Sequence, residues 1–309
     1  MDNTGIYPKF PNNRPLTQWE REKQLRQKQR LDVAPRSELA VVKLNSTYLQ
    51  SVDRWYGTRG FLALLGLAIA GICLYWSADF LWIVASGQVP NENGLWPVIF
   101  TGCAVLLVLA LLGLSMAGKE LFRWTYYPIA LDRKRRMVHV FRLDGTVLSV
   151  PWDEVFFTLG RGKGIFGALN WDLRGLVLHA DRKTVRETFA FSIVIDREEV
   201  VLAHWEFLRR YMEEGPAAVI DAVRFCMPVD GQREPAAAGR ERIFANHVAM
   251  PGAMWLVMWP FNTLQSWARM LVMRTSRIPQ WPPEVAATLT VADGDPYVRD
   301  ARINPPDLR

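Results

Sequence analysis

Two groups of basic residues are the side chains best suited to bind a charged ligand. Cations near an anionic membrane surface each contribute on the order of 1 kcal/mol to binding. We expect both groups to bind an anionic lipid or a protein partner. For the first group, which is consecutive in sequence, a simpler explanation is a solvated flank that only sets membrane topology. The groups consist of Arg133, Lys134, Arg135 and Arg136 and, further along the chain, Arg161 and Lys163.

The glycine-rich stretch 160–167, GRGKGIFG, invites comparison with a phosphate-binding loop. Glycines let backbone amides approach an anion, and Lys163 could neutralise it. However, the P-loop spacing is absent, neither serine nor threonine follows Lys163, and the stretch lies between two strand patterns instead of opening a helix. We therefore predict a flexible hairpin loop.

Patterns that carry catalysis or bind metals are missing from the sequence. No nucleophile elbow, HExxH motif or paired carboxylates stand out, and neither the histidines nor the cysteines have metal-ligand spacing. We expect no catalytic residue, no metal site, no cofactor and no enzyme activity. The dispersed residues are His139, His179, His204, His247, Cys73, Cys103 and Cys226.

Two long uncharged blocks dominate the first half of the chain. Residues 60–78 form nineteen uncharged positions, roughly 28 Å as a helix, and residues 95–116 form twenty-two. The hydrocarbon core of a bilayer is about 30 Å thick. Because the polar stretch 86–94 between the blocks is short, we predict a two-helix transmembrane hairpin over residues 60–116. A buried helix pair in a soluble protein would need far more surrounding chain.

Charge asymmetry predicts the orientation of this hairpin. Residues 1–59 carry eleven basic against six acidic residues and residues 117–137 carry six against two, while 86–94 holds no lysine or arginine. Positive flanks remain in the cytoplasm. We therefore expect a multi-pass protein of the bacterial inner membrane with both termini cytoplasmic.

Aromatic residues at the ends of the blocks are candidates for membrane anchors, because amphipathic rings favour the headgroup level. Asp79 ends the first uncharged run, so we expect it at the membrane interface; a functional carboxylate inside the membrane is the alternative. The anchor candidates are Trp76, Trp82, Trp96 and Trp124.

From residue 126 the pattern changes to short alternating runs separated by charged turns, which is typical of an antiparallel sheet. Asp144-Gly145 predicts a tight hairpin turn. Residues 196–213 form an amphipathic helix, acidic in its first turn. The prediction is an α+β membrane protein, in which the hairpin is followed by a small antiparallel β barrel capped by a helix, within a domain over 126–226.

The order IALD, basic turn, MVHVFRL, turn and Pro151-Trp152-Asp153-Glu154-Val155 resembles pleckstrin-homology-like domains that follow transmembrane hairpins in bacterial proteins. Together with the basic N-terminal segment and the hairpin, the passage YYPIALDRKRRMVHVFRLDG is similar to an uncharacterised family of proteobacterial membrane proteins, a domain of unknown function. Members of that family are encoded near type VI secretion effectors. The resemblance implies a binding or scaffolding module.

Three further segments complete the expected layout. Residues 1–59 form a cytoplasmic basic segment with a solvated helix near the anionic leaflet, which makes nucleic acid an unexpected partner. Residues 243–278 form an interfacial apolar segment interrupted by prolines, which lies on the membrane or packs on the β domain; a third crossing by residues 248–264 is the alternative. Residues 279–309 form a proline-rich extended tail. The basic residues of the expected helix are Arg21, Lys23, Arg26, Lys28 and Arg30.

The expected function is an accessory or immunity-type protein of a type VI secretion effector locus, which binds a partner protein, such as a secreted effector, through its cytoplasmic β domain. A first alternative is a transport or channel subunit built by oligomerisation of the hairpin around Asp79. A second is a membrane scaffold that senses anionic lipid through residues 133–136.

Overall fold

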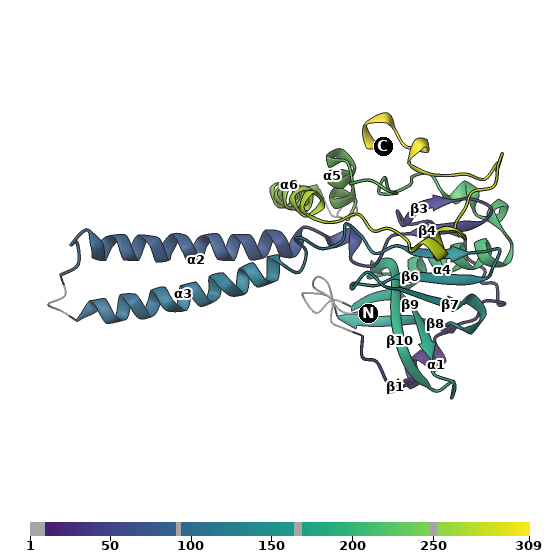
Figure 1. The fold of residues 1–309 in the computed structure, drawn as a ribbon, viewed down its shortest axis with the longest axis horizontal. Helices are drawn as coiled ribbons and strands as arrows, with labels where there is room; N and C mark the ends of the chain where they lie inside the picture. The colour runs from purple at the N-terminus through teal and green to yellow at the C-terminus, as the bar shows by residue number, and fades with distance from the viewer. Residues whose placement is uncertain (1–9, 91–93, 164–168, 247–251) are drawn as a thin grey trace. The chain divides into compact units, whose positions relative to one another are not determined.

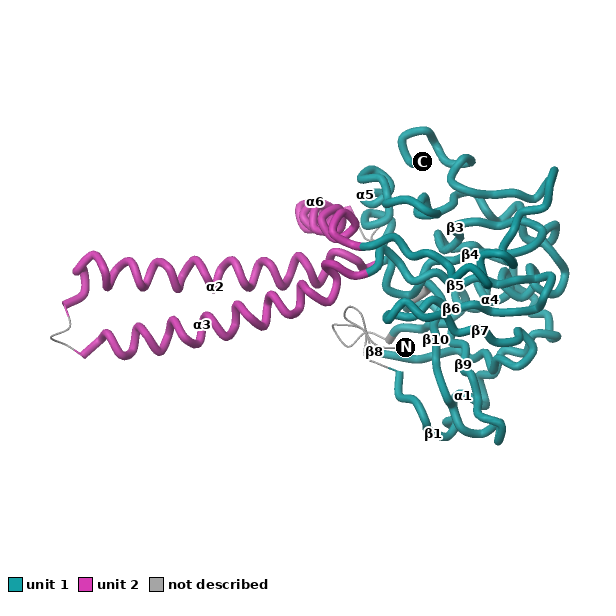
Figure 2. The backbone as a smooth tube through the Cα atoms, in the orientation of Figure 1, with its two compact units in different colours: residues 1–57, 124–246, 277–309 teal, residues 58–123, 247–276 magenta. Residues whose placement is uncertain are grey.

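The computed structural model describes residues 10–90, 94–163, 169–246 and 252–309. The chain forms two compact units, each assembled from separate stretches of sequence (Figure 2). Unit 1 contains residues 1–57, 124–246 and 277–309, and unit 2 contains residues 58–123 and 247–276.

One antiparallel sheet of unit 1 joins strands from both sides of the apolar hairpin (Figure 1). The strand before the hairpin pairs with the strand after it, with Ser51 opposite Ile129 and Tyr48 opposite Asp132. Gly145 has a φ of 88° in the turn between β6 and β7, as the Asp144-Gly145 pair predicts. The strands in spatial order are β3 (Val41–Leu44), β4 (Tyr48–Ser51), β5 (Ile129–Asp132), β6 (Met137–Phe141) and β7 (Val147–Pro151).

The second antiparallel sheet contains the remaining strands of unit 1. All six strands that the alternating pattern predicts are present, but the expected closed barrel is wrong. Among the described residues no strand pairing joins β7 to β8, so the strands form two open sheets connected by the 3₁₀ turn Trp152–Glu154. The spatial order is β1 (Arg14–Pro15), β10 (Thr184–Ile195), β9 (Leu169–Leu178), β8 (Phe156–Lys163) and β2 (Gln24–Leu25).

A shared hydrophobic core holds the two sheets and helix α4 (Glu198–Glu213) together. Trp205 of α4 stacks on Trp152 at 5.8 Å and lies 4.8 Å from Phe157, between ring centroids. All three side chains are fully buried. Aromatic side chains of this size dominate the energetics of a core, so the predicted amphipathic helix is the element that joins the sheets.

The N-terminal segment is part of unit 1, which corrects the expectation of a solvated helix over the basic run. Helix α1 spans only Gln18–Glu22, starts at the capping box of Thr17 and Glu20, and is followed at once by β2. Lys23 pairs with Glu198 at 2.9 Å and Lys28 with Glu213 at 2.6 Å. Lys23 and Lys28 therefore lie against acidic residues of α4.

The C-terminal residues are also packed on unit 1, which corrects the expectation of an extended tail. Val285 and Leu289 join a small apolar cluster with Tyr48 and Ala130 on the first sheet. Arg299 exchanges two backbone hydrogen bonds with Leu44, at 2.8 and 2.9 Å, and so covers the edge of β3. The short helical elements of this region and of the stretch before it are α5 (Ala236–Ala245), α7 (Pro283–Ala286) and 3₁₀ turns at Pro216–Ala218, Ile220–Ala222, Ala301–Ile303 and Pro306–Leu308.

The described residues of unit 2 contain three α-helices, α2 (Phe61–Ala85), α3 (Leu95–Ala117) and α6 (Gly252–Thr275). The first two lie side by side and antiparallel (Figure 1), as the two uncharged blocks predict. Helix α2 continues beyond the predicted end at residue 78, so Asp79 lies inside the helix. Helix α6 is continuous through Pro260.

Candidate functional site

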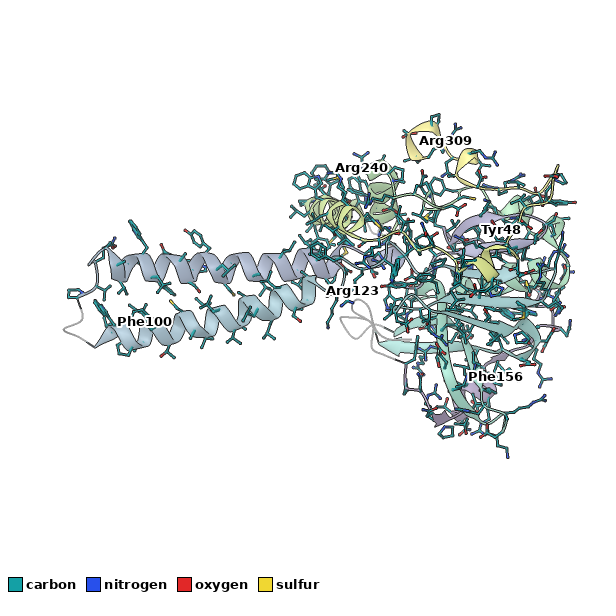
Figure 3. The ribbon with its side chains drawn as sticks, viewed as in Figure 1. Tyr48, Phe100, Arg123, Phe156, Arg240 and Arg309 are labelled. Carbon is teal, nitrogen blue, oxygen red and sulfur yellow. The ribbon has the colours of Figure 1, made fainter. Side chains whose placement is uncertain are left out.

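The apolar surface of α2 and α3 is the most unusual feature of the described residues. By length and composition both helices are able to cross a membrane, and only 33% and 17% of their most apolar windows are buried. Many of their large apolar side chains are exposed, among them Phe100, which is 48% exposed and is labelled in Figure 3. Val98 and Leu111 are 67% and 66% exposed. Soluble monomers rarely expose continuous apolar patches of this extent.

Small residues form the contact between α2 and α3. A Cβ atom on Gly113 would lie 2.6 Å from the carbonyl oxygen of Gly66, and one on Gly66 would meet the carbonyl of Gly113. Ala70 and Ala110 continue this contact and are 2% exposed. Small residues let helix backbones approach closely in the way that membrane helices associate. These residues are therefore used inside the hairpin and are not available for the oligomerisation of hairpins.

A carboxylate fixes the charged end of the helix pair. Glu120, three residues after α3, accepts hydrogen bonds at 3.0 Å from the backbone N–H groups of Gly60 and Ala63, in the first turn of α2. Burial raises the pKa of Glu120 and outweighs these hydrogen bonds and the nearby charge of Arg59. The end of α3 thus caps the start of α2, because the first N–H groups of a helix have no partner within it.

Three of the four predicted anchor tryptophans lie on the hairpin. Trp76 and Trp82 of α2 are 47% and 68% exposed, and Trp96 of α3 donates to the carbonyl of Val89 at 2.9 Å. Trp124 belongs to unit 1 instead, where its ring lies 5.2 Å from that of Phe141. Its indole N–H donates to the carbonyl of Leu143, at 3.2 Å. The role of Trp124 as a membrane anchor stays a prediction.

The basic run lies in the turn between β5 and β6, and internal contacts hold its arginines. Arg133 donates to the carbonyl of Ser46 at 2.9 and 3.1 Å, and Arg135 to Asp132 and to the carbonyl of Thr288. Lys134 and Arg135 are exposed. Their binding to lipid or a partner stays a prediction that rests on these two exposed side chains.

Arg136 makes the strongest of these internal contacts. Its guanidinium donates to both carboxylate oxygens of Asp153 at 2.6 Å and to Glu213 at 2.7 Å. The hydrogen bond to Asp153 raises the pKa of Arg136, and the same contact lowers the pKa of Asp153. Arg136 therefore connects the β5–β6 turn to α4, and its guanidinium group makes a structural contact.

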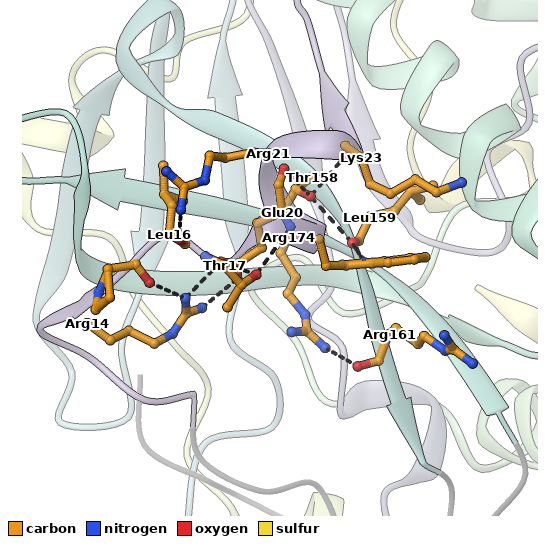
Figure 4. A network of polar contacts seen from close by, with 12 residues as sticks. Arg14, Leu16, Thr17, Glu20, Arg21, Lys23, Thr158, Leu159, Arg161 and Arg174 are labelled. Atoms are coloured by element: carbon orange, nitrogen blue, oxygen red, sulfur yellow. Dashed lines mark hydrogen bonds and ion pairs between the residues drawn. The ribbon is translucent and has the colours of Figure 1, made fainter.

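The second predicted basic group lies on β8. Arg161 is exposed, with its guanidinium carbon 5.6 Å from the ring centre of Trp19. The ammonium of Lys23 lies 5.4 Å from the same ring, and Trp171 is 5.8 Å away. The hydroxyl of Thr158 and the surrounding backbone hold α1 against this strand (Figure 4).

Lys163 ends β8 opposite Leu169. Its side chain and the loop residues 164–168 lie outside the described part of the chain. Among the described residues no contact joins this group to the basic run at 133–136, so the two predicted groups do not form one site.

A buried ionic cluster in the second sheet is the site that the sequence did not indicate. Asp172 is 1% exposed and lies 2.9 Å from Arg54 and 2.6 Å from Arg174. Gly160 stands opposite Asp172 in the ladder, where a Cβ atom would overlap these side chains. Gly160 is therefore part of β8 and makes room for the cluster, which corrects the prediction that the loop begins there.

One surface cavity of about 390 Å³ lies in unit 1 between residues 35–39 and 221–225. Glu38 and Leu39 on its wall have φ values of 50° and 51°, which non-glycine residues seldom adopt. Arg36 pairs with Glu38 at 2.8 Å on one wall, and Arg224 lies on the other. Its mixed charges indicate no single class of ligand. Among the described residues, no group of three histidine, cysteine or acidic side chains could hold a metal ion.

A comparison with known families finds a match over more than half of the chain. Residues 106–293 match the family described as "Family of unknown function (DUF6708)". The chain belongs to this family. The match to DUF6708 begins within α3 and continues through unit 1 into α6 and the residues after α7. No curated protein and no solved structure matches the chain.

Proposed function

We propose that this protein is an integral protein of the bacterial inner membrane, in which α2 and α3 cross the bilayer as a hairpin and unit 1 binds a partner protein in the cytoplasm. The observation that carries the proposal is the exposed apolar surface along both helices. Each apolar side chain moved from water into lipid contributes about 1.5–3 kcal/mol. A bilayer removes this apolar surface from water without the need for further protein.

Strand pairing supports the placement of both flanks on one side. Because β4 and β5 are neighbours in one sheet, the chain between Ser51 and Ile129 must return to the side from which it left. It therefore crosses an even number of times, and α2 and α3 provide two crossings. The flanks are rich in lysine and arginine while the connection 86–94 has neither, which favours the cytoplasm for unit 1.

Chemical labelling of intact cells tests this topology. Ser86→Cys lies in the connection after α2, and Lys134→Cys lies on the exposed turn of unit 1; the native cysteines are all buried. A membrane-impermeant maleimide should label the first variant in intact cells and the second only after lysis. Labelling of Ser86→Cys only after lysis, or recovery of the protein in the soluble fraction without detergent, would contradict the proposal.

The class of partner follows from the resemblance to proteobacterial membrane proteins encoded near type VI secretion effectors. On that basis we propose an accessory or immunity role in such a locus, with unit 1 as the binding module. The tagged protein, extracted in mild detergent, should enrich one effector encoded beside its gene. A deletion strain should become sensitive to that effector. Unchanged survival of the deletion strain would remove the immunity role and leave the membrane topology unaffected.

A further inference from the structure

The buried side of helix α6 combines polar residues with Ala268, Val272 and Met273, whereas its exposed side is largely apolar. Asn262, Gln265 and Arg269 are 0%, 5% and 0% exposed, whereas Trp267 and Leu264 are 62% and 47% exposed. A surface helix of a soluble protein has its apolar stripe toward the core and polar residues on its outward side, so the apolar outward side of α6 is unusual.

Five of the exposed apolar residues form a continuous face, while Met254, Trp255 and Trp259 are exposed on other sides of the first half of the helix. Leu264, Trp267 and Leu271 are spaced by three and four residues, so they lie on one side of the helix. Leu256 and Val257, two turns earlier, are 69% and 73% exposed. Arg274 follows on the same face in the last turn, where it is exposed.

Within unit 2, α6 packs on the charged end of the helix pair. The ring of Phe261 lies 6.2 Å from that of Phe61 in the first turn of α2, and the hydroxyl of Ser276 donates to the carbonyl of Glu120 at 3.4 Å. In Figure 1 its axis points toward the viewer, across the direction of α2 and α3. Helix α6 therefore crosses the hairpin where its apolar length begins.

The ends of α6 exclude a third crossing. Before it, Asn246 donates to the carbonyl of Gly57 at 2.9 Å; after it, the carbonyl of Arg277 accepts from the N–H of Thr125 at 2.8 Å. All four residues belong to unit 1. Since unit 1 is one compact body, the chain between Asn246 and Arg277 must cross the bilayer an even number of times, and a single helix allows only zero.

We propose that α6 lies in the plane of the membrane surface, with the face of Leu256, Val257, Leu264, Trp267 and Leu271 at the boundary between headgroups and acyl chains of the cytoplasmic leaflet. This inference rests on the proposed function of the hairpin. The outward face is suited to a bilayer because it adjoins the apolar surface of α2 and α3. It also carries the indole of Trp267 and ends in the cation of Arg274, which can reach the headgroups. Unit 2 is then an anchor with two crossing helices and one surface helix.

Depth measurements on the full-length protein test the placement. Cysteines replace Leu264, Trp267 and Leu271 one at a time, in a chain whose native cysteines are alanine, and each carries a nitroxide label. The protein is reconstituted in vesicles of phosphatidylethanolamine and phosphatidylglycerol. Collision with oxygen and with a water-soluble nickel complex should place all three labels at one shallow depth, about 5–10 Å below the headgroups. Every variant must elute like the unmodified protein in detergent.

A label at Leu107, in the middle of α3, separates this inference from the proposed function. If Leu107 is deep and the three α6 labels are in water, the surface helix is wrong and the hairpin stands. If depth increases steadily along α6, the helix spans and the inference is also wrong. Spin–spin broadening at α6 with loss of both collision signals would mean that a second copy covers the face. A label at Leu107 in water would overturn the hairpin and the surface helix together.

Discussion

At the scale of single residues, Asp172 shows what stabilises a charge inside the second sheet. Its carboxylate contacts the guanidinium groups of both Arg54 and Arg174, and the ring of Phe10 lies 5.3 and 4.9 Å from their guanidinium carbons. Removing one partner of a buried ion pair leaves the other charge desolvated, which costs more than the pair contributes.

Asp172→Asn should therefore lower the free energy of unfolding by about 2–4 kcal/mol, since two arginines lose their shared counter-charge and Arg174 is only partly buried. Urea unfolding of the protein in detergent, followed by tryptophan fluorescence, measures the change. Asp196→Asn is the matched control, because Asp196 is exposed in the turn before α4. Equal stabilities of the two variants would show that the cluster contributes nothing to folding.

The buried ring of His204 predicts a dependence of stability on pH. Desolvation lowers its pKa to about 4, although the hydrogen bond from Nδ1 to the carbonyl of Arg36 acts in the opposite direction. In the unfolded chain the ordinary pKa of histidine is near 6.5. Below that pH the unfolded state takes up a proton that the folded state does not, so stability falls between pH 6.5 and about 4, by roughly 3 kcal/mol.

His204→Gln should flatten this part of the stability curve, because glutamine keeps a donor for the Arg36 carbonyl and does not titrate. His179→Gln should leave the curve unchanged, since that side chain is exposed on the second sheet. Denaturant midpoints at several pH values between 7 and 4 give the comparison. A His204→Gln curve that parallels the unmodified protein would exclude His204 as the titrating group.

At the scale of elements, local patterns predict what local physics determines. Alternation of apolar and polar residues predicts the strands β5 to β10, and uncharged length predicts α2 and α3. Strands β1 and β2 are two residues long and have no periodicity, so nothing near them in sequence indicates a strand. The pairing of β4 with β5 spans the whole hairpin, and no local pattern carries that information.

The candidate site was predictable to the same extent. The apolar hairpin follows from composition alone, whereas the roles of the basic residues depend on partners far away in the chain. The arginines of the β5–β6 turn donate hydrogen bonds to Ser46, Thr288 and Glu213. Arg54 and Asp172 meet only because both reach the second sheet. Charge density in a sequence therefore did not distinguish a surface available for binding from a structural contact.

Gly113→Val tests the contact between α2 and α3. The added side chain would press on the backbone of Gly66 and separate the helices, which typically costs about 1–3 kcal/mol. The melting temperature of the protein in detergent should fall by several degrees. Gly102→Val is the control on the same helix, because an added Cβ there meets nothing within 4 Å. Equal losses in both variants would mean that valine lowers stability without regard to helix contact.

At the scale of the whole molecule, the sequence of unit 1 is interrupted twice by that of unit 2. The residues at which the chain leaves and re-enters unit 1 lie close together. Tyr56 and Tyr126 lie 6.4 Å apart between ring centroids, and Asn246 and Arg277 are hydrogen bonded to their neighbours Gly57 and Thr125. The sheets and their shared core use no residue of the helix pair. Unit 1 thus has the contacts of an independent domain.

Replacing residues 58–123 and 247–276 by glycine–serine linkers should therefore give a protein that is soluble without detergent. We expect a cooperative thermal transition and a circular dichroism spectrum dominated by strand. The full-length chain, prepared in the same buffer without detergent, should sediment with the membranes. A shortened chain that is recovered only as aggregate, or that melts without a transition, would mean that unit 1 depends on unit 2 to fold.

The position of Arg299 on the edge of β3 has a consequence for biosynthesis. Strands β3 to β7 leave the ribosome early, but Val285, Leu289 and Arg299, which cover one face and one edge of that sheet, follow about 150 residues later. At roughly 5–20 residues per second, the C-terminal residues that pack on this sheet are synthesised on the order of ten seconds after its last strand. The helix pair precedes these residues in translation. In the proposed topology the pair is therefore available for insertion first, and the final folding step of unit 1 takes place on a chain already tethered to lipid.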